Sequence, residues 1–130
     1  MLLFLRRSIW RAYFSLLHDK IDREVADNRI WNHLSRAIPN AKRRSSYPAL
    51  KIGRLAVCKE SQRSGLGREI LNFIQTWFYY AAKAGCRFIT VDALLSAERF
   101  YNNCNFRRLT NPAPDDETVL MYFDLKSLTV

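Results

Sequence analysis

An apolar segment, a Gly-x-Gly turn and a long amphipathic segment follow one another within residues 48–84. Residues 49–58 read ALKIGRLAVC, and the alternation of apolar residues slips by one position after Gly53, which indicates a strand with a β-bulge. Over Gly65–Ala84, apolar residues recur every three or four positions, which predicts a helix that Gly85 ends. A strand that leads into a helix and then back into the sheet needs a crossover connection. The fold class expected is therefore α/β or α+β with a mixed sheet.

The other elements are predicted from shorter patterns. Ile9–Leu17 is rich in aromatic and apolar residues and predicts a strand, with His18–Lys20 as a turn, although Leu2–Leu17 also fits a helix. Asp22–Ile38 predicts a helix whose apolar stripe starts at Val25. The remaining elements expected are a strand over Cys86–Leu94, a short helix over Ser96–Asn103, and strands over Phe106–Leu109 and Thr118–Leu125.

Length and composition fit one folded domain over residues 1–130, of which 48% are hydrophobic. No apolar run reaches the roughly 18 to 20 residues that cross a bilayer, and the first residues do not follow the order of a secretory signal, so no membrane association is expected. Cys58, Cys86 and Cys104 lie far apart, without a C-x-x-C pair. This spacing argues against a zinc site or a disulfide framework, and it predicts a cytoplasmic protein without a metal.

The chain is strongly basic, with a formal net charge of +9. Residues 1–44 hold ten Lys and Arg against four Asp and Glu, so +6 of the charge lies in this part. Such an excess favours polyanionic partners, namely a nucleic acid or a nucleotide cofactor. An inert basic surface explains the charge equally well.

The segment QRSGLG (62–67) can bind an anion, because a helix start leaves backbone N–H groups unpaired and carries partial positive charge. No Lys-Ser or Lys-Thr follows the second glycine, so this is not a nucleoside-triphosphate loop. The third glycine and the acidic residue of a dinucleotide fingerprint are missing as well. Taken alone, the Gly-x-Gly pattern also fits a plain tight turn.

Three motifs together resemble the GNAT N-acetyltransferases. The family signature Q/R-x-x-G-x-G/A is matched by Gln62, Gly65 and Gly67. GRLAV (53–57) is similar to the strand that binds acetyl-CoA, and AERFYNNCNF (97–106) is similar to the later A-x-x-F-Y element. The resemblance covers about residues 48–125 and implies the GNAT fold, a mixed but mostly antiparallel central sheet with flanking helices. It leaves residues 1–47 as a shortened N-terminal arm, for which a homodimer could complete the acceptor site.

The resemblance also implies roles for individual residues. Tyr101 corresponds to the tyrosine that protonates the leaving coenzyme A thiolate, and the Val57 N–H would stabilise the thioester oxygen. Tyr101 could instead be an aromatic residue that only packs against Phe100 and Phe106. Acetyl-CoA as co-substrate would be held by the following residues: Leu55, Val57, Lys59, Gln62, Arg63, Ser64, Gly65, Leu66, Gly67 and Arg68.

Two positions depart from the family pattern. Asn105 stands where the family has Gly before the final Phe, and Asn is the residue after Gly that best adopts a left-handed backbone. The stretch VDALLSAE (91–98) lacks the Asn that often binds pantetheine in this family.

The acceptor that the resemblance implies is a primary amine, which attacks the thioester of acetyl-CoA directly and takes over its acetyl group. The pattern is closest to the branch that includes toxin-like transfer-RNA acetyltransferases, whose acceptor is aminoacyl-tRNA. In that case Lys42, Arg43 and Arg44 would contact the nucleic acid, although these residues also fit a solvated loop. A degenerate acyl-CoA-binding module without activity is the alternative class of function.

Overall fold

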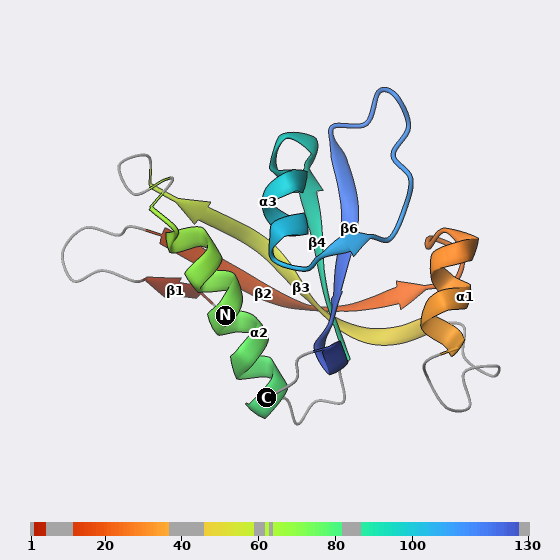
Figure 1. Cartoon of the computed structure of the whole chain (residues 1–130), viewed down its shortest axis with the longest axis horizontal. Helices are drawn as coiled ribbons and strands as arrows, with labels where there is room; N and C mark the ends of the chain where they lie inside the picture. The colour runs from red at the N-terminus through yellow and green to blue at the C-terminus, as the bar shows by residue number, and fades with distance from the viewer. Residues whose placement is uncertain are drawn as a thin grey trace.

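The computed structural model describes residues 2–4, 12–36, 46–58, 62, 64–81 and 87–127. The strands are β1 (Leu2–Phe4), β2 (Ala12–Asp22), β3 (Ser46–Val57), β4 (Phe88–Leu94), β5 (Arg107–Arg108) and β6 (Thr118–Asp124). The helices are α1 (Asn28–Arg36), α2 (Leu66–Ala81) and α3 (Glu98–Asn103), with 3-10 turns η3 (Leu95–Ala97) and η4 (Leu125–Ser127). Figure 1 shows these elements around one twisted sheet.

The strands form a six-stranded sheet in the order β1-β2-β3-β4-β6-β5. Within the described residues, β3 and β4 make the parallel pair and the other neighbouring strands are antiparallel. The long connection through α2 joins the two parallel strands, as a crossover requires. The prediction of a mixed, mostly antiparallel sheet with flanking helices is confirmed.

The strands β3 and β4 separate halfway along their length. Their ladder runs from Ala49–Phe88 to Ile52–Val91. Beyond this point β3 continues along β2 as far as Val57, and β4 continues along β6 as far as Leu94. Figure 1 shows the two strands diverging at this end of the sheet. One edge of the second half of β3 therefore lacks a strand partner in the described part of the chain.

The expected bulge lies where the apolar alternation slips. Ser15 on β2 is opposite Arg54, but the next residue, Leu16, is opposite Ile52, so Gly53 is the extra residue of β3. A Cβ built on Gly53 would lie 2.9 Å from Ser15 Oγ, which is closer than real Cβ contacts. Glycine thus lets β2 pass close to the bulge, next to the point where β3 leaves β4.

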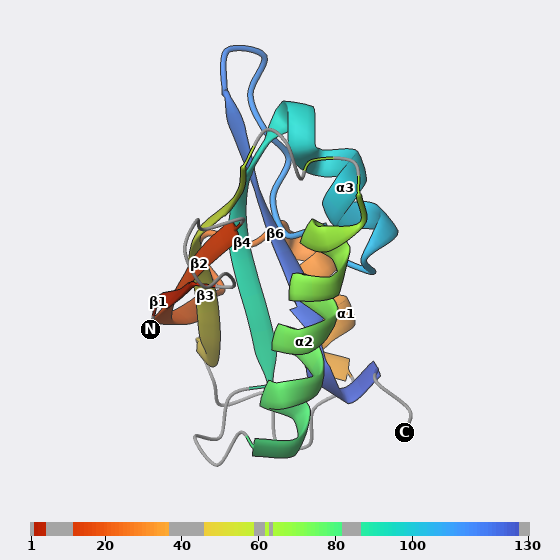
Figure 2. The same cartoon turned by 90° about the vertical axis from the view of Figure 1, so that its left-hand side faces the viewer.

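The main core lies between the sheet and α2, on the side of the sheet that also carries α3 (Figure 2). Ile70, Leu71 and Ile74 are the buried hydrophobic residues among the described side chains of α2. Phe73 and Trp77, which belong to the same apolar pattern, are 50% and 37% exposed. A second cluster connects α1 to the sheet. Trp31 of α1 stacks on Tyr47, whose ring is tilted against Phe88, and Phe88 is edge-on to Tyr122; Leu34 of α1 belongs to the same cluster.

Two predicted boundaries near the N-terminus are wrong. His18–Lys20 is not a turn, because β2 runs on to Asp22 and pairs with the start of β3. The alternative of a helix over Leu2–Leu17 is contradicted by β1 and β2. The polar segment is held in the sheet by Thr90 on β4, whose hydroxyl donates to Asp19 Oδ2 at 2.6 Å.

The helix expected over Asp22–Ile38 is shorter than predicted. The carboxylate of Asp27 accepts a hydrogen bond from the Arg29 N–H at 2.9 Å, which is the arrangement of an N-cap, so α1 begins at Asn28. Val25 lies before this cap and is 56% exposed. Ile38 and the residues up to 45 are outside the described part of the chain.

The boundaries of the later elements were predicted closely. The long helix begins at Leu66, one residue after Gly65, and its predicted end with the Gly85 cap is outside the described residues. The expected short helix is divided into η3 and α3, and the strand expected over Phe106–Leu109 is only two residues long. Among the described helices, none is long and apolar enough to span a membrane.

Asn105 adopts the left-handed conformation that the sequence predicts, with φ of 70°, and is the one non-glycine residue with positive φ in the described part of the chain. We expect Asn105→Gly to leave the free energy of unfolding unchanged or slightly raised. Asn105→Val should lower it by about 1 to 2 kcal/mol, because a β-branched residue is strained at this φ. Urea denaturation followed by circular dichroism measures both changes. Asn102→Val, in the exposed face of α3, is the control, and an equal loss in both Val variants would contradict the prediction.

Candidate active site

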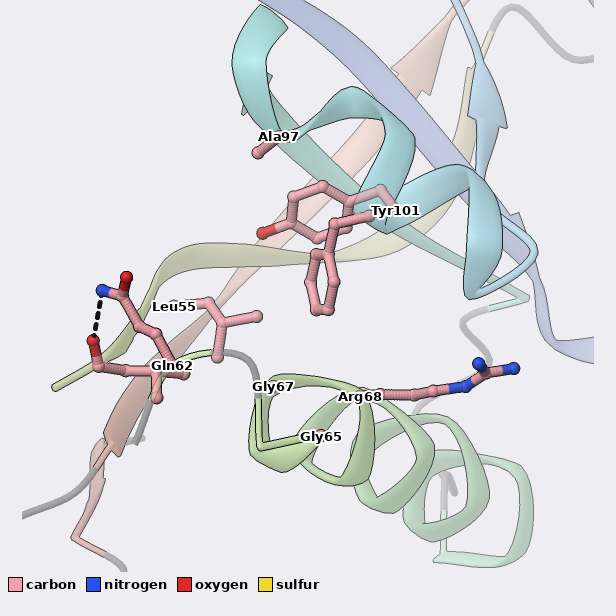
Figure 3. A pocket seen from close by; sticks show the side chains of 9 residues that line it. Leu55, Gln62, Gly65, Gly67, Arg68, Ala97 and Tyr101 are labelled. Atoms are coloured by element: carbon pink, nitrogen blue, oxygen red, sulfur yellow. Dashed lines mark hydrogen bonds between the residues drawn. The ribbon is translucent and has the colours of Figure 1, made fainter. Parts of the chain in front are cut away.

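A cavity of about 560 Å³ opens where β3 and β4 separate, between the start of α2 and the short helix α3. Its lining residues come from two stretches of the chain, 55–68 and 97–101: Leu55, Val57, Gln62, Gly65, Gly67, Arg68, Ala97, Phe100 and Tyr101. Figure 3 shows how they surround the opening. The walls are mainly apolar, whereas one side is formed by the N-terminus of a helix. The cavity can therefore accept a ligand that is apolar in one part and anionic in another.

Gly65 lets the chain turn into α2. Its φ is +85°, a conformation that favours glycine, and no atom lies within 4 Å of a Cβ built on it. Its carbonyl accepts the first helical hydrogen bond, from Glu69 N at 3.0 Å. The unpaired N–H groups of the first turn of α2 follow directly, so partial positive charge lies at this end of the cavity.

Gly67 has a different role from Gly65. It lies in the first turn of α2, and a Cβ built on it would be 3.1 Å from Cζ of Phe100 and 3.7 Å from Cγ2 of Val57. The absence of a side chain therefore lets α2 pack closely on α3 and on the end of β3. The second glycine of the motif brings these three elements together around the cavity.

The end of β3 is tied to the loop by Gln62. Its side-chain Nε2 donates to the carbonyl oxygen of Val57 at 3.0 Å, the dashed line in Figure 3. In an extended strand the C=O and N–H groups of one residue point to the same edge. Because Gln62 lines the cavity, this contact indicates that Val57 directs its polar backbone groups toward the cavity.

Tyr101 combines a buried ring with a hydroxyl that points into the cavity (Figure 3). The residue is 7% exposed, and its ring is edge-on to Phe100 and Phe106 at centroid distances of 5.1 and 5.4 Å. Burial, with a smaller contribution from Cys104, raises the pKa of Tyr101 to about 12. The phenol is therefore protonated at neutral pH and can donate a proton or a hydrogen bond.

The structure brings together most of those predicted site residues that it describes. Seven of them line the cavity: Leu55, Val57, Gln62, Gly65, Gly67, Arg68 and Tyr101. Ser64 is an exposed turn residue next to the cavity, and Leu66 packs against the core. The Arg68 side chain extends away from Gln62 and Leu55 in Figure 3. The other predicted residues are outside the described part of the chain: Lys42, Arg43, Arg44, Lys59 and Arg63.

Ala97 and Phe100 line the cavity but were not predicted as site residues. Both belong to the AERFY segment that also supplies Tyr101. The sequence could have predicted both, because Ala97 lies three residues before Phe100 and four before Tyr101, and residues three or four apart in a helix lie on the same face. A helix that directs Tyr101 into the cavity must direct Ala97 there as well.

The family model described as the acetyltransferase (GNAT) domain matches residues 16–108. No curated protein matches the chain. Solved structures are similar at low sequence identity, including a tyrosine-to-phenylalanine mutant of KacT, with 23% identity and a TM-score of 0.71. AtaT complexed with acetyl-methionyl-tRNAfMet has 22% identity and a TM-score of 0.73.

A mutant of the AtaT toxin, bound to the C-terminus of the antitoxin AtaR and to acetyl-CoA, has 20% identity and a TM-score of 0.65. These likenesses concern the fold. The alignment with KacT covers 91% of this chain and 64% of KacT, and the alignment with AtaT in its tRNA complex covers 95% and 70%. The chain thus spans about two thirds of the length of these proteins.

Proposed function

The chain belongs to the GNAT acetyltransferase domain family, and from this premise we propose that it is an N-acetyltransferase that moves the acetyl group of acetyl-CoA to a primary amine. The observation that supports this most directly is the cavity itself. It joins an edge of β3 that has no strand partner in the described part of the chain, a glycine-containing helix start and a buried phenol. These three parts match the three parts of the co-substrate, namely pantetheine, pyrophosphate and thioester.

The free edge of β3 suits the pantetheine arm. Beyond Ile52 this edge has no β4 partner among the described residues, and Gln62 marks it as the edge to which the Val57 backbone points. Leu55 has the same orientation as Val57, since backbone groups alternate along a strand. Their N–H and C=O groups can pair with the two amides of pantetheine as with an added strand. Lys59, outside the described residues, would continue this series.

The start of α2 suits the pyrophosphate. Ser64 and Gly65 precede the helix, and a ligand can approach the turn closely because nothing lies within 4 Å of a Cβ position on Gly65. The unpaired amides of the first turn and the helix dipole would hold the two phosphates. Arg68 adds positive charge in the first turn of α2, and Arg63, outside the described residues, would add a second charge before it.

The chemistry rests on two groups that line the cavity, the Val57 N–H and the Tyr101 hydroxyl. Acetyl-CoA, when bound, supplies the acetyl group as an activated thioester. Val57 N–H would donate to the thioester oxygen as the amine nitrogen attacks the carbonyl carbon. Tyr101 Oη would give its proton to the sulfur as the carbon–sulfur bond breaks, and water would take the proton that the amine loses. The raised pKa of Tyr101 keeps this proton in place at neutral pH.

Ser64 offers a direct test of the pyrophosphate position, because Ser64→Glu and Ser64→Gln introduce side chains of similar size and differ in charge. We expect Ser64→Glu to weaken acetyl-CoA binding at least tenfold relative to Ser64→Gln, by repulsion between the carboxylate and the phosphates. Calorimetric titration of acetyl-CoA into each folded variant gives the Kd values. Gly67→Glu is less suitable, since any side chain there meets Phe100. Equal Kd values for the Glu and Gln variants would exclude the α2 start as the phosphate site.

Aminoacyl-tRNA is the second candidate acceptor. It is favoured by the net charge of +9 and by the similarity of fold to AtaT, whose structure contains acetyl-methionyl-tRNAfMet. Lys42, Arg43 and Arg44, outside the described residues, would contact RNA phosphates in this reading. Acetylation assays with free amines and with aminoacyl-tRNA at several salt concentrations distinguish the two acceptors, because only RNA binding should weaken steeply with salt. If the chain binds acetyl-CoA but acetylates neither free amines nor aminoacyl-tRNA, the result would favour an acyl-CoA-binding module without catalytic activity.

We further propose one GNAT-like domain over residues 1–130, with the N-terminal arm (1–47) followed by the acetyl-CoA core (48–125). The buried thiol of Cys104 is free, which supports the proposal of a cytoplasmic location. The homodimer stays a prediction. A metal plays no part in the proposed chemistry.

A further inference from the structure

A second cavity, of about 430 Å³, lies where α1, the turn before β5, β6 and η4 meet. It shares no lining residue with the first cavity, and its walls are His33, Leu34, Asn105, Arg107, Tyr122, Asp124 and Ser127. In Figure 1, α1 lies at the opposite end of the molecule from the start of α2. This cavity is therefore separate from the site proposed for acetyl-CoA.

Tyr122 is a buried polar residue whose hydroxyl is not paired. The residue is 9% exposed, and its ring is edge-on to Phe88 at a centroid distance of 6.2 Å. Its hydroxyl makes no hydrogen bond to any described residue, and no described side-chain polar atom is both enclosed and unsatisfied. The hydroxyl therefore opens into the cavity that Tyr122 lines. Because the hydroxyl is open to the cavity and makes no hydrogen bond within the described part of the chain, it is available to donate to a ligand there.

The charge of the cavity is positive. Arg107 lies directly opposite Tyr122 in the β5–β6 ladder, and its Nη1 donates to the Phe106 carbonyl at 2.9 Å. The other N–H groups of this guanidinium are available to a ligand. Asp124 is the one carboxylate of the lining, and both of its oxygens accept hydrogen bonds from Arg87 at 3.0 Å. The Asp124 charge is thus balanced, whereas no carboxylate among the described residues forms an ion pair with Arg107.

The side chains around the cavity are mainly hydrogen-bond donors, or can act as donors. Arg107, the amide of Asn105 and the imidazole of His33 come from three separate elements. Burial, together with the charge of Asp124, raises the pKa of Tyr122, so its hydroxyl is a donor at neutral pH. Several hydrogen-bond donors around the positive charge of Arg107 are the arrangement that binds an oxyanion.

We propose that this second cavity binds a phosphate group, held by Arg107 and Tyr122 with Asn105 and His33 completing the shell. A phosphate presents three or four acceptor oxygens in a tetrahedron, which donors from separate elements can satisfy together, whereas a carboxylate presents two oxygens in a plane. Arginine is the side chain best suited to phosphate recognition. The phosphate can be free or carried by a small ester, and the cavity volume leaves room for an attached group. This inference is independent of the function proposed for the first cavity.

The test is a titration of the full chain with inorganic phosphate, followed by backbone amide NMR shifts, with chloride at matched ionic strength as reference. We expect saturable shifts at Asn105 and Arg107 that chloride does not cause. Arg107→Gln should weaken binding about tenfold and Tyr122→Phe roughly fivefold, by loss of a charged and a neutral hydrogen bond. Tyr122→Phe removes only the unpaired hydroxyl, so it should fold normally. Arg99→Gln, on the exposed face of α3, is the matched control and should bind like the wild type.

Two further titrations show whether the bound phosphate is free or part of an ester, and at which cavity it binds. Adenosine monophosphate that binds more tightly than inorganic phosphate assigns the cavity to a phosphate ester, and equal or weaker binding assigns it to free phosphate. Saturating acetyl-CoA should leave the shifts unchanged. Shifts that acetyl-CoA abolishes would show phosphate at the start of α2 instead and would overturn the proposal. Shifts that chloride reproduces, or that survive unchanged in both Arg107→Gln and Tyr122→Phe, would overturn it as well.

Discussion

Replacement of Tyr101 by Phe is expected to lower kcat by a factor of about 10² to 10⁴, the usual contribution of a general acid. The substitution removes only the hydroxyl that points into the cavity, and it keeps the ring contacts with Phe100 and Phe106. The Kd for acetyl-CoA should therefore change little. The measurements are release of free coenzyme A with the acceptor on which the wild-type chain is most active, and calorimetry for the Kd.

The control for this variant is Tyr79→Phe, which makes the same change on the outer side of α2, where Tyr79 is 41% exposed. It should leave kcat unaltered. Equal kcat values for Tyr101→Phe and the wild type would contradict the acid role and leave Tyr101 as an aromatic packing residue.

The pH profile gives a second readout of Tyr101. Burial raises the pKa of this phenol to about 12, above the value of about 10 for an exposed tyrosine. The proton that the reaction needs is present below the pKa and lost above it. The reaction rate should therefore stay constant up to roughly pH 10 and decline only when the pH approaches the raised pKa of Tyr101. A decline centred near the ordinary tyrosine pKa would mean that Tyr101 is more exposed to water during catalysis than in this structure.

The sequence alone was sufficient for most of the candidate site, because its residues are close together in the chain. The slip in alternation after Gly53 located the bulge, and the choice of Asn at position 105 predicted its positive φ. Both are local effects, in which a residue type and its own backbone conformation determine each other. The three motifs then placed the strand, the loop and Tyr101 around one cavity.

Contacts between distant segments could not be predicted in this way. His18–Lys20 has the composition of a turn, and it is a strand because the start of β3 pairs with it and Thr90, 71 positions from Asp19, donates to that carboxylate. Gly67 was assigned to anion binding, whereas its contact with Phe100 depends on the packing of α2 on α3. The second cavity is formed by segments from residue 33 to residue 127, and no single motif spans them.

The largest loss of stability among the expected results is for Phe106→Ala, which should lower the free energy of unfolding by about 3 to 5 kcal/mol. Phe106 is fully buried at 0% exposure, with its ring 5.4 Å from that of Tyr101 and 5.6 Å from that of Phe123. Its removal leaves a cavity between α3 and the sheet, in addition to the lost burial of the ring. Because the Tyr101 ring packs directly on this space, the hydroxyl should also be positioned less well. Urea denaturation gives the stability, and the residual kcat of the folded fraction gives the second effect.

Two variants separate these effects. Phe106→Leu fills part of the space and should cost less than the alanine variant, with a partial recovery of kcat. Phe73→Ala makes the same truncation at a side chain that is 50% exposed on α2, so it should cost about 1 kcal/mol or less. If Phe106→Ala costs no more than Phe73→Ala, then the aromatic cluster of Tyr101, Phe106 and Phe123 does not hold α3 on the sheet. The position of the Tyr101 hydroxyl would then have to be set by the contact of Phe100 with Gly67.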